Sequence, residues 1–451
     1  MRQHSRSRRL LALLLGLTIV AAACGGDDDD SAENDEGGGG EETTTTTEVD
    51  PKIAAANEVG DADPSCEAET DGKLTVGELL PETGDLAFLD PPMRAGAQIA
   101  LDEINAAGGV LGQPVEYLPG DSGDESPDLA NPTVDSHIQG GADMILGAAA
   151  SGISLNVIDK ITGACMIQFS PANTSPAFLD YADDDLYFRT APSDILQGRV
   201  NADRAIGDGV TNMAILYRQD SYGEGLRLYF KQPFEEQGGT IPVDQAYDPE
   251  AQDFSAEVDA VVNSDADGLI LIGFDESSRI LAGLFEQGFT PDEKTIYLVD
   301  GNTGNALGED FADQEGALEG ITGTYPSAEL TDEFRQKMLD TNAELVDFLY
   351  GPETYDAMII TALAAEQAET DQADEVARNI NAVTRDGTEC TGFVECRDLI
   401  AAGEDIDYTG PSGPQDFSRP GEPTKASFAV ETFGADNQLD PDQIEFISAE
   451  L

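Results

Sequence analysis

The chain has 451 residues, of which 89 are Asp or Glu and 23 are Lys or Arg, so its formal net charge at pH 7 is −66. This much negative charge repels phosphate groups, and we therefore expect neither nucleic acid nor an anionic lipid surface as a partner. We interpret the charge as a solvated acidic surface suited to salty surroundings rather than as an acidic ligand site.

Residues 1–23 have the three-part layout of a secretory signal peptide. An arginine-rich start precedes an apolar run from Leu10 to Ala23, which is shorter than the roughly 20 residues of a membrane-spanning helix. Cys24 follows small residues at the expected cleavage site and resembles the lipobox cysteine of bacterial lipoproteins, which is acylated and becomes the new N-terminus. The alternative is an ordinary secretion signal with an incidental cysteine. We expect an extracytoplasmic protein, lipid-anchored through Cys24 to the outer face of the bacterial cell membrane.

Residues 24–72 are predicted to form a disordered acidic tether. They contain runs of aspartate, glycine and threonine at Asp27–Asp30, Gly37–Gly40 and Thr43–Thr47. Such a segment buries too little apolar surface to offset the entropy that is lost on ordering. A flexible chain of this length has a root-mean-square reach of roughly 35–40 Å, which would let a folded body meet a partner at the membrane surface.

Four cysteines remain besides Cys24, and an even number in an oxidising compartment indicates disulfides. Cys390 and Cys396 are close enough in sequence for the loop between them to close locally. Cys66 and Cys165 are then expected to form the second pair. Because the four thiols have no CxxC spacing and no histidine partners, we expect no metal site.

From Leu74 onward, short apolar runs alternate with longer segments of helical periodicity. In the first set, strands are expected at Leu74–Leu80, Val115–Leu118, Met144–Gly147 and Met166–Phe169. The helices of this set are expected at Met93–Ala107, Asn131–Gly140 and Ser154–Thr162. This alternation predicts a parallel sheet covered on both faces.

A second set of the same kind follows. Its strands are expected at Met213–Tyr217, Ile241–Ala246, Leu269–Ile272 and Ile296–Val299, and its helices at Ile195–Ile206, Gly225–Gln237, Phe254–Asn263 and Ser277–Gln287. The remaining residues are expected to return to these two sets. They contain predicted helices at Thr331–Leu339, Thr354–Ala368, Asp374–Ala382 and Phe393–Ala402, predicted strands at Ile321–Thr324, Ala426–Thr432 and Glu445–Ile447, and a loop or crossing at Tyr408–Pro423.

The predicted fold class is therefore α/β, with two doubly wound parallel-sheet lobes around a cleft. We place lobe I at residues 73–192 and 302–380, and lobe II at residues 193–301 and 381–451. In open parallel sheets, ligands bind in the crevice beyond the carboxyl ends of the strands, so the loops after the strands form the candidate site. The candidate ligand-binding residues in these loops are Phe88, Ser151, Gly152, Ala172, Asn173, Thr174, Tyr222, Asp275, Glu276 and Asp300.

The chemistry of these loops differs between the lobes. In the first lobe, the hydroxyls of Ser151 and Thr174 and the N–H groups of a helix start suit a carboxylate. In the second lobe, the carboxylates of Asp275 and Glu276, together with Tyr222, suit an ammonium group. Phe88, which follows the first strand of the first lobe, can line an apolar wall. Each group alone also has an ordinary explanation, such as a serine N-cap or an acid in the first turn of a helix. Together they indicate a site for a free amino acid.

Several of these segments resemble the branched-chain amino-acid-type solute-binding proteins of ABC importers. They are Leu146–Ser151 (LGAAAS), Phe169–Thr174 (FSPANT), Asp220–Gly225 (DSYGEG), Ile104–Gly109 (INAAGG) and Tyr355–Ala357 (YDA). The resemblance covers about Leu74 to Ala368, with the motifs in the right order. It implies a type I periplasmic-binding-protein fold, in which two lobes joined by three crossings close over the ligand.

The resemblance also implies roles for individual residues. Ser151 and the segment Ala172–Thr174 would hold the α-carboxylate of the ligand and part of its ammonium group. Tyr222 would cover the ligand from the second lobe, and Glu276 would pair with the ammonium. The loop before Glu276 is about one residue shorter than the usual form of the family, so Asp275 is the alternative partner of the ammonium.

We expect a receptor and not an enzyme. Of the two histidines, His4 lies in the signal peptide and His137 in a predicted helix, and neither a GxSxG nor an HExxH motif is found. We expect no cofactor, a monomer, and delivery of an amino acid, branched-chain by resemblance, to ABC permease subunits. Closure around the ligand would create the surface that the permease recognises. The alternatives are an amide- or urea-type solute receptor and a sensory ligand-binding protein of the same fold.

Overall fold

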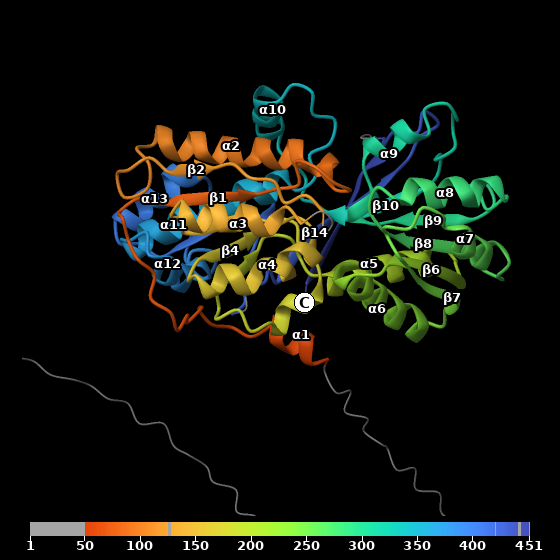
Figure 1. Cartoon of the computed structure of the whole chain (residues 1–451), viewed down its shortest axis with the longest axis horizontal. Helices are drawn as coiled ribbons and strands as arrows, with labels where there is room; N and C mark the ends of the chain where they lie inside the picture. The colour runs from red at the N-terminus through yellow and green to blue at the C-terminus, as the bar shows by residue number, and fades with distance from the viewer. Residues whose placement is uncertain (1–49, 125–127, 420, 441–442, 451) are drawn as a thin grey trace, which may run out of the picture. The chain divides into compact units, whose positions relative to one another are not determined.

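Two β-sheets, each covered by helices on both faces, organise the chain (Figure 1). The computed structural model describes residues 50–124, 128–419, 421–440 and 443–450. The predicted signal peptide, Cys24 and residues 24–49 of the predicted tether lie outside these ranges. Within them, none of the helices has both the length and the apolar composition that a membrane crossing demands.

The first sheet is parallel throughout, in the order β2-β1-β3-β4-β5. Its strands are β1 (Thr75–Leu79), β2 (Glu116–Leu118), β3 (Met144–Gly147), β4 (Ile167–Ser170) and β5 (Tyr187–Arg189). One face packs against α3 (Ala130–Gln139) and α4 (Ser151–Gly163), and the other against α2 (Asp90–Ala106), α11 (Gly351–Ala368) and α12 (Ala373–Ile380). Neighbouring strand residues such as Met144 and Ile145 belong to opposite layers, which explains the unbroken apolar runs in the sequence.

The second sheet has the order β15-β14-β10-β9-β8-β6-β7. Its strands are β6 (Asn212–Arg218), β7 (Thr240–Tyr247), β8 (Gly268–Ile272), β9 (Thr295–Leu298), β10 (Thr322–Pro326), β14 (Lys425–Thr432) and β15 (Glu445–Glu450). Helices α5 (Asp194–Gly207) and α6 (Ser221–Glu236) cover one face, and α7 (Ser255–Val262) and α8 (Ser277–Glu286) cover the other. The strands are parallel except that β14 and β15 form an antiparallel edge, so the predicted α/β class is confirmed with this addition.

Shorter elements complete the two lobes. They are α1 (Pro51–Ala56), α9 (Asn305–Asp310), α10 (Asp332–Thr341), α13 (Phe393–Ala401), the 3-10 helices η1 (Ala87–Leu89), η2 (Pro176–Asp180) and η3 (Asp300–Asn302), and a small sheet of β11 (Thr388–Cys390), β12 (Ile406–Gly410) and β13 (Gly413–Pro414). The main chain passes between the lobes at residues 190–193, 327–331 and 415–424, so the number of crossings is the three that the resemblance implies.

The lobe boundaries differ from the prediction in two places. Strand β10 pairs with β9 and β14, so residues 302–326 belong to the second lobe and not to lobe I. Residues 381–414 belong to the first lobe and not to lobe II, because Phe393 and Tyr408 are buried in the same core as α2 and α11. Sheet pairing and core packing decide these boundaries, and neither can be seen in a linear pattern of apolar runs.

The stretch predicted as a loop at Tyr408–Pro423 begins in regular structure. Strands β12 and β13 pair antiparallel, and the buried carboxylate of Asp356 on α11 holds them to the first lobe. Asp356 accepts a hydrogen bond from the Tyr408 hydroxyl at 2.6 Å and another from the Ser412 N–H at 2.9 Å. Only the part after Pro414 forms the third crossing.

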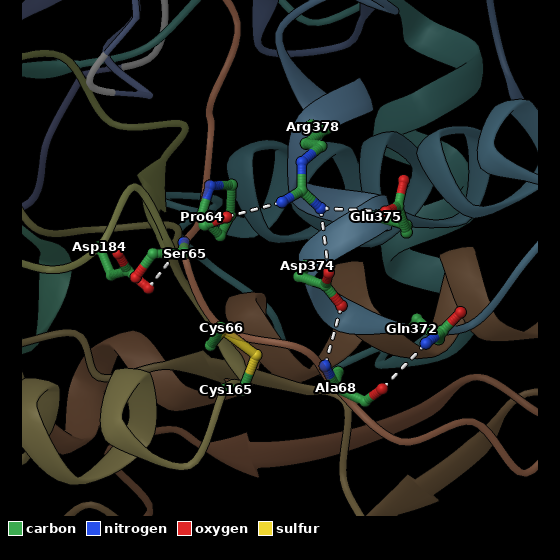
Figure 2. The surroundings of a disulfide bond; sticks show 10 residues. All are labelled: Pro64, Ser65, Cys66, Ala68, Cys165, Asp184, Gln372, Asp374, Glu375 and Arg378. Carbon is green, nitrogen blue, oxygen red and sulfur yellow. Dashed lines mark hydrogen bonds and ion pairs between the residues drawn. A yellow bond between two sulfur atoms is a disulfide. The ribbon is translucent and has the colours of Figure 1, made fainter.

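Residues 57–72 are fixed on the first lobe, which corrects the predicted tether over its last part. Figure 2 shows the Cys66–Cys165 disulfide and the polar contacts beside it. The buried carboxylate of Asp374 accepts the Ala68 N–H at 3.0 Å, and Arg378 donates to the Pro64 carbonyl at 2.6 Å. Backbone hydrogen bonds and a cross-link thus supply order that the composition of the segment does not reveal.

Both predicted disulfides are present. The Cα atoms of Cys66 and Cys165 are 5.9 Å apart, and those of Cys390 and Cys396 are 5.4 Å apart. The first bond spans 99 residues of sequence, whereas the second spans 6. The first therefore restricts the unfolded chain much more strongly.

We predict that the double variant Cys66→Ser/Cys165→Ser loses about 4–5 kcal/mol of unfolding free energy, because it releases the long loop. The matched variant Cys390→Ser/Cys396→Ser should lose about 2 kcal/mol. Urea unfolding of the purified protein measures both values. Equal losses in the two variants would contradict the loop-length explanation.

Candidate ligand-binding site

Five of the predicted residues line one small cavity between the lobes. They are Ser151, Ala172 and Thr174 from the first lobe and Tyr222 and Asp300 from the second, and the cavity volume is about 10 Å³. Each of the five lies after the carboxyl end of a strand in its own lobe, as parallel sheets require of a ligand site. A cavity of this size holds about one water molecule, so the lobes are closed on each other.

The first-lobe side of the cavity is the start of α4. Ser151 is the first residue of this helix, and the N-cap is Ala150, so the Ser151 side chain is not the expected cap. The Ser151 hydroxyl is buried and accepts the Ser175 N–H at 3.3 Å. The first N–H groups of a helix have no intrahelical acceptor, so this end can receive an anion.

Two neighbours of Ser151 and Thr174 have other positions. Gly152 lines an adjoining cavity of about 200 Å³. Asn173 is fully buried, and its side-chain amide donates to the Ala148 carbonyl at 3.0 Å and the Ala149 carbonyl at 2.8 Å. Asn173 therefore positions the loop before α4 and does not line the central cavity.

The second-lobe side is organised around the Asp300 carboxylate. It accepts hydrogen bonds from the hydroxyls of Tyr222 and Tyr350, each at 2.7 Å, and from the Gln197 side-chain amide at 3.0 Å. The ring of Tyr222 stacks on Phe274, with 5.4 Å between the centroids. Among the described residues, no Lys or Arg forms an ion pair with Asp300.

A second buried carboxyl, on Asp194, was missed by the sequence analysis. Asp194 is fully buried at the start of α5, and its N–H donates to the Thr174 carbonyl at 2.8 Å. Neither of its carboxyl oxygens has a hydrogen-bond partner within the described part of the chain. Burial, followed by the charge of Asp300, raises the pKa of Asp194 well above its usual range, although Arg189 and the Thr174 hydroxyl oppose this.

Asp300 and Asp194 respond differently to burial. Desolvation raises the pKa of Asp300 as well, but the hydrogen bonds from Tyr222, Tyr350 and Gln197 counteract it. Burial therefore favours the protonated form of Asp194 more strongly than that of Asp300, whose hydrogen bonds stabilise the ionised form. A cation that entered the site would favour the ionised form of both.

Glu276 forms an ion pair with Arg218 of the protein, whereas the resemblance implied that it pairs with the ammonium group of the ligand. Its buried carboxylate lies 3.3 Å from Nη1 of Arg218 and accepts the Tyr247 hydroxyl at 2.8 Å. The Arg218 guanidinium in turn lies 3.5 Å from the ring centroid of Phe274. Glu276 lines none of the cavities between the lobes that are described above.

Asp275 and Phe88 meet at another small pocket, of about 20 Å³, next to the central cavity. Asp275 is exposed, and burial of part of its side chain raises its pKa. The two pockets share Phe274 as a common wall. The structure thus separates Phe88, Asp275 and Glu276 from the five residues that line the central cavity.

Residues 73–432 match the family model described as periplasmic binding protein. The chain belongs to the periplasmic binding protein family. The resemblance seen in the sequence is therefore confirmed, together with its two-lobed fold. The chain spans only a little more than half the length of the first curated relatives that it matches.

Three comparisons illustrate the family. The Leu/Ile/Val-binding protein BraC3 of Rhizobium johnstonii is 29% identical over 213 residues, which are 46% of this chain and 57% of that relative. The branched-chain amino acid substrate binding protein LivJ of Streptococcus pneumoniae, in complex with isoleucine, superposes with a TM-score of 0.69 at 20% identity over 84% of this chain and all of that one. A solute binding protein of R. palustris in complex with 4-hydroxybenzoate superposes with a TM-score of 0.68 at 16% identity, over 84% of this chain and 98% of that one. At these identities the two structures establish the fold alone.

We predict that Glu276→Gln destabilises this periplasmic binding protein by about 3 kcal/mol, because it leaves buried Arg218 with one fewer charged partner. Its affinity for the ligand should change less than about threefold, since the side chain does not line the central cavity. Urea unfolding and calorimetric titration measure the two effects, and Asp275→Asn is the exposed control for both. A loss of binding with unchanged stability would restore Glu276 as the partner of the ligand.

Proposed function

We propose that the protein is the receptor for a free amino acid with an apolar side chain, of the branched-chain type, and delivers it to an ABC permease. The observation that supports this most directly is the pair of buried carboxyls, Asp194 and Asp300, neither of which forms an ion pair with a Lys or Arg of the described residues. A buried carboxylate without a cation is costly, and a ligand ammonium would remove that cost.

The opposite wall of the cavity has groups that suit the carboxylate of an amino acid. The hydroxyls of Ser151 and Thr174 and the first turn of α4 lie across the cavity from Asp300. A carboxylate at a helix N-terminus accepts N–H groups and interacts favourably with the helix dipole. Carboxylate and ammonium would then each contact a different lobe, so the ligand would hold the lobes together.

The side chain of the ligand is expected to contact apolar residues. Leu86, Leu89 and Phe274 line the cavity and belong to one buried cluster with Met93. These walls suit a branched aliphatic group and offer few partners for a polar one. The names of BraC3 and LivJ point to the same class of ligand.

The small volume of the cavity supports a closing mechanism. An amino acid does not fit into about 10 Å³, so the lobes must separate before it enters. The open and closed forms would be related by rotation at the three crossings, and the ligand would favour the closed form. A permease that recognises both lobes together would then receive only loaded receptors.

The proposal includes attachment to the membrane. Cys24, outside the described residues, would carry the lipid, and the monomeric receptor would act on the outer face of the cell membrane. The protein would bind and deliver its ligand without chemical change, and so we assign it no catalytic role.

The ligand class can be tested by isothermal titration of the protein without its signal peptide. The panel contains leucine, isoleucine, valine, alanine, glutamate, lysine, 4-hydroxybenzoate, acetamide and urea. We expect the branched-chain amino acids to bind and the aromatic acid to be rejected, because it brings a carboxylate and no ammonium. Binding of acetamide or urea alone would favour an amide receptor, and no response to any amino acid would refute the proposal.

We predict that Asp300→Asn weakens amino-acid binding by about 2 kcal/mol or more, or roughly thirtyfold in Kd, because the ammonium loses its charged partner. The two tyrosine hydroxyls donate to different oxygens of Asp300. The carboxamide keeps one oxygen to accept one hydroxyl, and its NH2 group can donate to the oxygen of the other, so the lobes should still close. Asp275→Asn is the control and should bind normally. Equal affinity in Asp300→Asn and the parent protein would show that the ligand ammonium does not bind at Asp300.

We also predict that ligand binding releases up to one proton per molecule. Asp194 is protonated in the free protein at pH values below its raised pKa, and the ammonium favours its ionised form. Affinity should therefore rise with pH, by at most about tenfold per pH unit, until the pKa of free Asp194 is passed. Titrations in buffers of different ionisation enthalpy measure the released proton, and Asp194→Asn should abolish both effects. A pH-independent affinity in the parent protein would contradict this assignment.

A further inference from the structure

A second cavity, of about 160 Å³, lies between the lobes and shares no residue with the central cavity. The first lobe contributes Arg335 on α10 and the segment Val346–Leu349. The second lobe contributes Asn305 at the start of α9 and Leu439 and Phe446 near β15. Figure 1 shows α10 beside α2 on the first lobe and α9 above β10 on the second. The cavity therefore has walls from both lobes, like the central one.

Arg335 differs from every other arginine in the described part of the chain. The other described arginines each donate a hydrogen bond or form an ion pair with a carboxylate or a carbonyl. Arg335 has no such acceptor among the described residues, and its guanidinium lies 4.6 Å from the ring centroid of Phe348. In a chain with 89 acidic and 23 basic residues, an arginine without an acid partner is unexpected.

The acids near Arg335 already have partners. Asp347 accepts the N–H of Asn305 at 2.9 Å and its side-chain amide at 2.6 Å, and these bonds join the two lobes. Glu431 accepts the Tyr325 hydroxyl at 2.5 Å. Burial raises the pKa of Glu431 and the charge of Arg335 lowers it, but the two residues form no ion pair in the described part of the chain. The guanidinium is thus the polar group of this cavity whose donors are free for a ligand.

The remaining walls are apolar, and two of them are open to solvent. Val346 is 70% exposed and Phe446 is 38% exposed, which places both among the few large apolar side chains at the surface of the described residues. Val346 comes from the first lobe and Phe446 from the second, and both line the cavity together with Phe348. A ligand in this cavity would therefore shield apolar surface that water now reaches.

We infer that this cavity is a second ligand site, for a small monocarboxylate with an apolar body. The carboxylate binds the Arg335 guanidinium, whose planar donors match it in a two-pronged pair, and the hydrocarbon part packs on Phe348, Leu439 and Phe446. Asp347 and Glu431 repel any further negative charge, so a monoanion is selected over a dianion. The volume is below the roughly 300–1,000 Å³ of drug-sized pockets, which restricts the site to a small acid.

The position of the cavity gives it a regulatory effect. Because its walls come from both lobes, the acid binds the closed arrangement and favours it. This step rests on the proposed function, since the central ligand favours closure as well. The two ligands then strengthen each other's binding by the same factor.

The test uses hexanoate and benzoate as probes, titrated into the parent protein and followed by calorimetry and saturation-transfer NMR. We expect both acids to bind and hexylammonium, which has a similar chain and the opposite charge, not to bind. Arg335→Gln should weaken acid binding at least tenfold. Arg279→Gln is the matched control, because Arg279 also lies over a phenylalanine ring, 4.9 Å from the centroid of Phe254, and it should bind the acids normally.

The variant Asp300→Asn distinguishes the central site from this one. It should still bind the acid but should no longer bind the amino acid. Saturating hexanoate should lower the leucine Kd of the parent protein severalfold and leave that of Arg335→Gln unchanged. Failure of the parent protein to bind either acid, or equal binding in Arg335→Gln, would overturn the second site whatever the outcome for leucine. Loss of the acid in Asp300→Asn would assign it to the central cavity instead. If the parent protein binds two equivalents of leucine and Arg335→Gln binds only one, the ligand of this second site is a zwitterionic amino acid and not a monocarboxylate.

Discussion

The carboxylate of Asp300 lies fully desolvated where the two lobes meet, and side chains from both lobes donate hydrogen bonds to it. Tyr222 and Gln197 belong to the second lobe, whereas Tyr350 reaches it from the first. These bonds compensate part of the cost of burying the charge, and they exist together only when the lobes are closed. The same group therefore stabilises the closed form, and neither it nor neighbouring Asp194 forms an ion pair with a Lys or Arg of the described residues. In the proposed function, recognition of the ligand and closure of the lobes would both depend on this buried negative charge.

The sequence predicted those parts of the structure that depend on local pattern. The apolar runs identified most strands of both sheets, and the loops after them contained Ser151, Thr174, Tyr222 and Asp300. Strand β5 was not predicted, and the sequence analysis also missed Asp194, which follows the first crossing. A polar residue just after a crossing is a signal that could have found it.

Other features depend on contacts between distant residues and could not be predicted in this way. Glu276 looked free to bind an ammonium because nothing in its own loop indicates that Arg218 lies beside it, 58 positions earlier in the chain. Tyr350 is even less visible, because it belongs to the opposite lobe from the Asp300 that it contacts. The lobe boundaries failed for the same reason, since strand pairing, and not apolar periodicity, assigns β10 to the second sheet.

The disulfide between Cys66 and Cys165 has a mechanical consequence. Lys52 on α1 donates to the Pro176 carbonyl of the first lobe, while Asp50, just before this helix, accepts the hydroxyl of Tyr229 in the second lobe. A force applied to the N-terminal end of residues 50–66 would first strain these noncovalent contacts and then reach a covalent bond in the first lobe. All three crossings come later in the chain, so they would carry none of that load. A receptor held by its N-terminus could thus be pulled firmly and still open and close with its second lobe unloaded.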